Sequence, residues 1–312
     1  MKALLKTWML AIAIVGGIVL YVGWMATPFG PAHIDSALGI IKTAQPILLF
    51  TMLFVSFSRV EPRHLTPRRW HLPLLALQVG LCLVCAALPF VLPNHVPPLV
   101  AQAAMLCFIC PTATAAIVVT GKLGGDIEGL TAYTTLANLA AALVIPTLAP
   151  IMAPHPLHDF ATSFVLILGR IFPMLILPFF VALLVRKLAP AFHQWVARRA
   201  EFSFYLWAVS LTLAIIVSSH AIATTTARPL MLGLIALISL ASCVLQFSLG
   251  RRIGRHYQQP IAAAQALGQK NTIFIIWAAY TFFDPASSIA GGFYSIWHNL
   301  WNSYQLSKLQ KT

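Results

Sequence analysis

The chain is dominated by uncharged apolar runs that are each about as long as a lipid bilayer is thick. The first of them, from Trp8 to Ala26, has nineteen residues and no charge. An α-helix needs roughly 20 residues to cross the hydrocarbon core, and it satisfies its backbone hydrogen bonds internally. Only 9% of the residues are charged, against about 25% in soluble domains. These features predict an all-α integral membrane protein that forms a single membrane domain.

The apolar runs are separated by charged residues, prolines and glycines. A length of 312 residues leaves room for about ten transmembrane helices of roughly 20 residues each. The expected spans are 7–27, 38–58, 71–93, 98–121, 128–152, 160–185, 203–221, 229–250, 260–282 and 286–306. The segment 158–200 is the hardest to divide, because its end merges into a basic helix.

The basic residues are distributed unevenly over the connections between these spans. Sixteen of the 20 Lys and Arg residues fall at the N-terminus, in the even-numbered connections and at the C-terminus, whereas the odd-numbered connections hold only Arg228. Helical membrane proteins keep positive charge on the cytoplasmic side. The distribution predicts a multi-pass protein with both termini in the cytoplasm. It also explains the net charge of +13, so no role in binding nucleic acid is needed to explain that charge. The first run is longer than the core of a signal peptide, so we expect its helix to be retained.

The sequence offers little evidence for a metal site or for an enzyme active site. Cys82 and Cys85, like Cys107 and Cys110, have the spacing of zinc ligands. All four lie inside expected spans, with no His or Asp nearby, and small polarisable residues are ordinary packing groups there. The sequence lacks phosphate-binding, dinucleotide-binding and hydrolase motifs, and no carboxylate lies near the middle of a span. We therefore expect neither an enzyme nor a bound cofactor.

Two expected spans contain helix breaks. In the fourth span, Pro111 removes a backbone donor and frees a carbonyl one turn earlier. In the ninth, Gly268 precedes Gln269, Lys270 and Asn271, so polar side chains lie in hydrocarbon beside a residue that permits unwinding. Broken helices at matching places in two halves indicate an inverted-repeat transporter. Because the two breaks are five spans apart, the chain is expected to form two inverted five-helix repeats.

Three short patches carry a resemblance to a known family. They are Cys110-Pro111-x-x-Thr114-Ala115, Gly268-x-x-Asn271, and the run from Phe293 to Asn299 that contains Ser-Ile-Trp-His-Asn. Together with the order of the spans, they are similar to the bacterial bile acid:sodium symporter family. The resemblance implies a protein of the bacterial inner membrane that moves an organic anion, such as a bile salt or a small organic acid, by alternating access.

The same resemblance implies two structural units. A panel would contain spans one, two, six and seven, within residues 1–58 and 160–221. A core would contain the other six, within residues 71–152 and 229–306, with the broken spans four and nine crossing inside it. The substrate would bind between panel and core, and two sodium ions would bind behind the crossing.

The polar groups that face substrate in the family match Thr114, Asn271, His298 and Asn299. A hydroxyl, two amides and an imidazole can together hold a carboxylate or sulfonate, although such groups also join helices to one another. Arg170, in span six, is a further candidate: it either helps to bind the anion or caps carbonyls between panel helices.

The sodium sites of the family are poorly matched. A Ser-Asn pair after the first break is replaced by Ala116 and Ile117, a span-five ligand by Leu130, and the acidic ligand of span nine by Ala266. Lys270 stands in place of a glutamine ligand. The oxygen-bearing residues that remain in the expected ion-site region are Gln78, Thr134, Thr135 and Gln269. A hard cation needs several oxygen ligands, preferably one of them charged, so sodium binding is doubtful.

Lys270 is the most informative residue, because a lysine at mid-membrane costs roughly 3 kcal/mol on translocon scales and is functional by default. Its ammonium could replace the sodium charge, by donating to Gln78, to Thr134 and to freed carbonyls. It could instead release and regain a proton, which would make protons the coupling partner, or attract the anion directly. A conventional sodium-coupled symporter, a non-transporting receptor with the same pocket, and an arsenite carrier acting through Cys110 remain alternatives.

Overall fold

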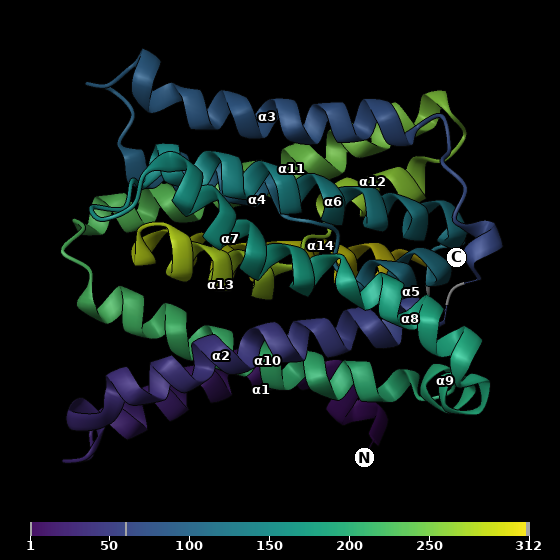
Figure 1. Ribbon diagram of the computed structural model, residues 1–312, viewed down its shortest axis with the longest axis horizontal. Coiled ribbons are helices and arrows are strands. Elements are labelled where there is room, and N and C mark those ends of the chain that lie inside the picture. The colour runs from purple at the N-terminus through teal and green to yellow at the C-terminus, as the bar shows by residue number, and fades with distance from the viewer. Residues whose placement is uncertain (1, 60, 310–312) are drawn as a thin grey trace.

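The computed structural model describes residues 2–59 and 61–309, and it is helical apart from one isolated β-bridge within them (Figure 1). The elements are α1 (Lys2–Met25), α2 (Gly30–Phe57), η1 (Pro62–His64), α3 (His71–Val91), α4 (Pro98–Ile109), α5 (Ala115–Lys122), α6 (Ile127–Met152), α7 (Phe160–Leu175), α8 (Leu177–Leu188), α9 (Pro190–Ala197), α10 (Ala200–Thr224), α11 (Pro229–His256), α12 (Pro260–Gly268), α13 (Thr272–Phe282), η2 (Pro285–Ser288) and α14 (Ile289–Leu309).

Five of these helices are long and apolar enough to cross a membrane: α2, α3, α6, α10 and α11. The pair α7 and α8 makes a sixth candidate if its two parts form one span. The protein is thus a helical integral membrane protein, as the sequence predicts. The count of ten stays a prediction, because other expected spans are short or divided: span four corresponds to α4 and α5, and span nine to α12 and α13.

The sixth expected span departs from a straight helix. Its halves α7 and α8 meet at Ile176 with a bend of 41°. Pro173 lies in the last turn of α7 and Pro178 in the first turn of α8. Each proline lacks the N–H that would continue the hydrogen-bond ladder, which accounts for the bend. The basic residues of this segment lie on either side of the separate short helix α9: Arg186 and Lys187 are in the last turn of α8, and Arg198 follows α9.

The helices are stacked in layers, with α3 at one edge of the molecule and α1, α2 and α10 at the other (Figure 1). Both α1 and α2 pack against α10, and α2 also packs against α7 and α8. Gly17 of α1 lies so close to α10 that an added Cβ would stand 2.8 Å from Cβ of Ile215, the close approach that small residues allow between membrane helices. On the other side, α3 packs on α4 and α6, and α11 packs on α4, α12 and α14.

The connections that carry most of the basic residues gather at one end of the molecule. The first turns of α1, the last turns of α14, and the loops that follow α2, α5, α8 and α11 all lie at this end (Figure 1). The loop before α11, which contains Arg228, lies at the opposite end (Figure 1). The uneven charge distribution of the sequence is therefore a separation of charge between the two ends of the fold.

Candidate functional site

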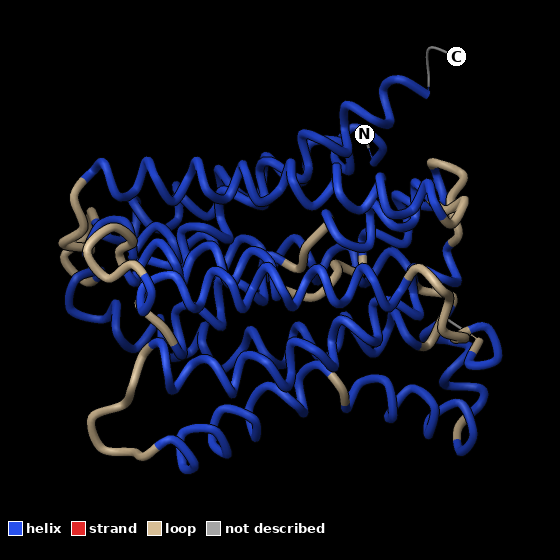
Figure 2. The backbone as a smooth tube through the Cα atoms, turned by 90° about the horizontal axis from the view of Figure 1, so that it is seen from above, coloured by secondary structure: helices blue, strands red, loops and turns tan. Residues whose placement is uncertain are grey.

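The two helix breaks meet inside the protein. Helix α4 ends at Ile109 and α5 begins at Ala115, while α12 ends at Gly268 and α13 begins at Thr272. The short loops between these halves lie within the helical bundle, away from the connections at its two ends (Figure 2).

The crossing loops pair as a minimal antiparallel ladder in which Thr112 lies opposite Lys270. The N–H of Ala113 donates to the carbonyl of Gln269 at 2.8 Å, and the N–H of Asn271 donates to the carbonyl of Pro111 at 2.9 Å. These two bonds satisfy backbone groups that the interrupted helices leave free, which is the condition for unwound backbone at membrane depth.

Side chains from neighbouring helices cap the ends of α4 and α12. Nε2 of Gln78, from α3, donates to the carbonyls of Ile109 at 3.1 Å and Cys110 at 3.3 Å. The hydroxyl of Tyr133 donates to Oε1 of Gln78 at 2.8 Å. At the other break, the hydroxyl of Tyr294, from α14, donates to the carbonyl of Gly268 at 2.9 Å. The crossing is therefore held by protein groups on both sides.

Further contacts connect the two loops directly. The hydroxyl of Thr112 donates to the carbonyl of Ala266 at 2.6 Å, and the thiol of Cys110 donates to the carbonyl of Asn271 at 3.0 Å. Gln246 of α11 donates to the carbonyl of Cys107 at 3.1 Å and to the Tyr294 hydroxyl at 2.9 Å.

Lys270 lies at the centre of this crossing and is fully buried. Its ammonium has no hydrogen-bond partner among the described residues. The titratable groups that act on it electrostatically are the thiols of Cys82, Cys107 and Cys110, with no carboxylate among them. Lys270 is thus a buried amine without an acidic partner in the described part of the chain.

The expected bonds from Lys270 to Gln78 and Thr134 are absent from the described structure. The Gln78 amide is occupied by the Ile109 and Cys110 carbonyls and by Tyr133, and the Thr134 hydroxyl donates to the carbonyl of Leu130 at 2.9 Å. Gln78 therefore performs the capping that was expected of Lys270, because its amide reaches the freed carbonyls without burying a charge.

Two of the expected substrate-binding residues flank the crossing. Thr114 is half-buried at the N-cap of α5, and Asn271 is buried at the N-cap of α13, where its Oδ1 accepts from the N–H of Phe274 at 3.3 Å. The other two lie on α14. His298 is buried edge-on against Tyr294, with no partner for its Nδ1, and half-buried Asn299 donates to the carbonyl of Ser295 at 2.7 Å.

Comparison of the sequence with known protein families shows which family this chain belongs to. The Sodium Bile acid symporter family matches residues 46–227, which is more than half of the 312 residues. The chain belongs to this family. Members of the family are membrane transporters of solutes and are not enzymes, so the prediction that the chain is no enzyme is confirmed. No curated protein matches the chain closely enough to count as a relative.

The positions at which sodium ligands were expected but not found form part of an apolar cluster. Ala116, Leu130 and Ala266 are each fully buried, and they pack in one cluster with Leu74 and Tyr133. Ile117 packs against the same cluster. Aliphatic side chains fill this region, and they offer no oxygen to a cation.

The remaining residues of the expected ion-site region are buried or half-buried around the crossing. Gln269 is buried, with no partner for its Oε1, and the half-buried Thr135 donates to the carbonyl of Thr131 at 3.3 Å. The Thr135 hydroxyl thus gives its proton to its own helix, while its oxygen can still accept.

Arg170 is not brought together with the other expected substrate residues of the transporter. It is exposed on α7 and lines a separate cavity of about 270 Å³ with His155 and His158, from the α6–α7 connection, and with Thr281 and Phe282 of α13. Its role at the substrate stays a prediction.

Sequence reasoning missed Tyr133, Tyr294 and Gln246 as parts of the crossing. Each is a polar residue inside a long apolar run. Such a position indicates a side chain that needs a hydrogen-bond partner within the protein, and it was the feature by which the sequence could have identified them. All three are buried, and each bonds to a group at or beside the breaks or to Gln78, which caps one of them.

Proposed function

We propose that this family member transports an organic anion by alternating access without sodium, with Lys270 supplying the positive charge at the crossing. The observation that carries the proposal is the fully buried, acid-free position of Lys270 directly opposite Thr112 where the two breaks meet. A buried ionisable group in a membrane protein marks a functional pathway.

The proposed architecture has ten spans in two inverted five-helix repeats. The antiparallel pairing of the breaks supports it, because broken helices at equivalent places in inverted repeats run past each other in opposite directions. In this arrangement α4 with α5 is span four, and α12 with α13 is span nine.

The proposed panel comprises residues 1–58 and 160–221, and the proposed core comprises residues 71–152 and 229–306. The packing of α1 and α2 on α10, and of α2 on α7 and α8, supports the panel, and the packing of α11 on α4, α12 and α14 supports the core. Rocking of one unit against the other would expose the crossing alternately to the two sides of the membrane.

The proposed orientation places both termini in the cytoplasm of a bacterium, with the chain in the inner membrane. The gathering of basic connections at one end of the fold supports it, since positive charge is retained on the cytoplasmic side. The loop before α11, which holds Arg228 as the single basic residue of the opposite connections, lies at the other end (Figure 1).

The proposed substrate is an organic anion, because the groups at the crossing favour negative charge. Lys270 is one such group. The N-termini of α5 and α13, capped by Thr114 and Asn271, are two more, because a helix N-terminus carries partial positive charge. His298 and Asn299 would add polar contacts from α14. In this scheme the ammonium either attracts the anion directly or carries the proton that drives its transport.

Sodium independence is supported by the apolar cluster. Ala116, Leu130 and Ala266 belong to one apolar cluster, at positions where the resemblance to the family implies oxygen ligands. A fixed ammonium in the same region would also repel a second cation.

Uptake into proteoliposomes tests transport directly. Thermal-shift screening of the purified protein against organic acids first selects the anion that stabilises it most, and the radiolabelled anion is then offered to vesicles. Accumulation without sodium supports the proposal. Binding without uptake under any sodium, pH or substrate gradient would make the protein a receptor that uses the same pocket.

Replacing Asn271 with alanine is expected to weaken binding of that anion by about 1–3 kcal/mol, the cost of leaving a buried polar partner unpaired. Isothermal calorimetry measures the change. Asn94→Ala is the matched control, since Asn94 is exposed in the loop after α3. Equal affinity in wild type and Asn271→Ala would remove Asn271 from the substrate site.

A further inference from the structure

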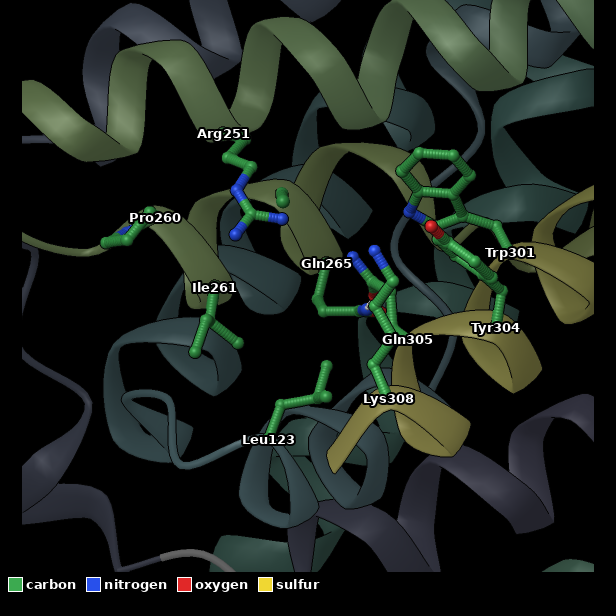
Figure 3. Close-up of a pocket in the computed structure, with 10 residues that line it drawn as sticks. Leu123, Arg251, Pro260, Ile261, Gln265, Trp301, Tyr304, Gln305 and Lys308 are labelled. Atoms are coloured by element: carbon green, nitrogen blue, oxygen red, sulfur yellow. Dashed lines mark hydrogen bonds between the residues drawn. The ribbon is translucent and has the colours of Figure 1, made fainter. Parts of the chain in front are cut away.

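A cavity of about 380 Å³ lies at the basic end of the molecule, where α11, α12 and α14 meet the end of α5. Arg251, from α11, and Lys308, from the last turn of α14, both line it (Figure 3). The other lining residues carry no acidic side chain. The cavity is therefore positively charged and separate from the crossing.

The wall of this cavity is built from polar groups on two helices. Gln265 of α12 is fully buried, and its Nε2 donates to Oδ1 of Asn302 and to Oε1 of Gln305, both at 2.9 Å. The indole Nε1 of Trp301 is buried without a partner among the described residues. In Figure 3 the Arg251 guanidinium and the indole nitrogen of Trp301 point toward the same space. An unused donor beside two cations suits an anionic oxygen.

An apolar groove continues from the cavity along α11 and α14. It has a volume of about 520 Å³ and shares Trp301 and Tyr304 with the charged cavity. Its other lining residues are Leu240, Cys243, Val244, Phe247, Trp297 and Leu300. From Leu240 to Arg251 the helix rises about 16 Å, which is about half of a 30 Å hydrocarbon core. The groove and the charged cavity together thus have the length of one leaflet.

We propose that the groove between α11 and α14 binds an anionic phospholipid, with the phosphate between Arg251 and Lys308 and an acyl chain along the groove. Cytoplasmic leaflets carry anionic lipids that basic residues near the membrane surface attract. Trp301 and Tyr304 lie where charge gives way to apolar lining, and aromatic residues of these types favour that depth of the bilayer.

This lipid has a structural consequence for the transporter. Gln265 belongs to α12, the half of broken span nine that leads to Lys270, while Asn302 and Gln305 belong to α14. A phosphate at this place would hold α12, α14 and α11 together at the basic end of the protein. The lipid site is distinct from the proposed transport site and does not depend on it.

Native mass spectrometry of the full chain in detergent tests the proposal with two lipids of identical chains, dioleoyl-phosphatidylglycerol and dioleoyl-phosphatidylcholine. The expected result is preferential retention of phosphatidylglycerol and a higher melting temperature with it. The double variant Arg251→Gln, Lys308→Gln should weaken that retention about tenfold or more, since each basic group near the membrane surface adds to the attraction for an anionic headgroup. Arg252→Gln is the control, because Arg252 is exposed on α11 but does not line the cavity.

A second variant separates the lipid from a free anion. Val244→Trp fills the groove and leaves both cations in place, so it should reduce retention of phosphatidylglycerol. Equal retention of the two lipids, or equal loss in Arg252→Gln and the double variant, would overturn the proposal. Protection by free glycerol phosphate that survives Val244→Trp, without retained lipid, would also overturn it and assign the cavity to a soluble anion.

Discussion

Replacing Lys270 with methionine is expected to abolish transport of the organic anion while raising the stability of the protein. The side chain is fully buried, and its ammonium has no hydrogen-bond partner among the described residues. A lysine at mid-membrane costs roughly 3 kcal/mol, so methionine, which has a similar length, should increase the free energy of unfolding by about 2–3 kcal/mol. Uptake into proteoliposomes and the melting temperature in detergent measure the two effects.

Lys42→Met is the matched control for this substitution. Lys42 is exposed on α2, with its ammonium 4.4 Å from the ring centroid of Tyr280, so its loss should leave transport unchanged. A lower melting temperature in Lys270→Met would mean that the ammonium holds the crossing together. Wild-type uptake with an unchanged response to a pH gradient would exclude both the anion-binding and the proton-coupling roles.

Replacing Gln78 with leucine should destabilise the crossing strongly. The change leaves the Ile109 and Cys110 carbonyls and the Tyr133 hydroxyl without their present partner. Each buried polar group left unpaired costs about 1–3 kcal/mol, so we expect a loss of about 3 kcal/mol or more in the free energy of unfolding. Denaturant titration in detergent measures this loss.

Gln45→Leu is the control for the loss of a buried amide. Gln45 of α2 is also buried, but its Nε2 has no partner among the described residues. Removing an unsatisfied polar group is expected to be neutral or stabilising. If the two leucine variants unfold at the same denaturant concentration as wild type, Gln78 is not a cap of the broken helix.

The helix breaks were predictable because each has a local cause in the sequence. Pro111 interrupts one run, and Gly268 with three polar neighbours interrupts the other, so both appear without knowledge of the fold. The structure adds the antiparallel contact between them, which joins residues 158 positions apart (270 − 112). That the protein is a helical membrane protein also follows directly from the sequence. Apolar runs of this length are unfavourable in water, and in a bilayer they satisfy their backbone hydrogen bonds as helices.

The partners of the polar residues were not predictable in the same way. The sequence places Gln78 within a span, but whether its amide meets an ion, Lys270 or a freed carbonyl depends on the rotation and depth of α3. The same holds for Tyr294, which reaches Gly268 only because α14 packs beside the end of α12. The bend at Ile176 similarly depends on the combined effect of Pro173 and Pro178, and a hydropathy pattern does not resolve it.

Sodium replacement is the most direct test of a built-in charge at the crossing. The dissociation constant of the purified transporter for its most stabilising organic anion is measured in sodium chloride and in choline chloride at the same ionic strength. With Lys270 buried opposite Thr112 and an apolar cluster at the sodium-ligand positions, we expect the two constants to agree within about twofold, or roughly 0.4 kcal/mol. A tenfold weaker affinity in choline, about 1.4 kcal/mol, would contradict the account and return the protein to the sodium-coupled members of its family.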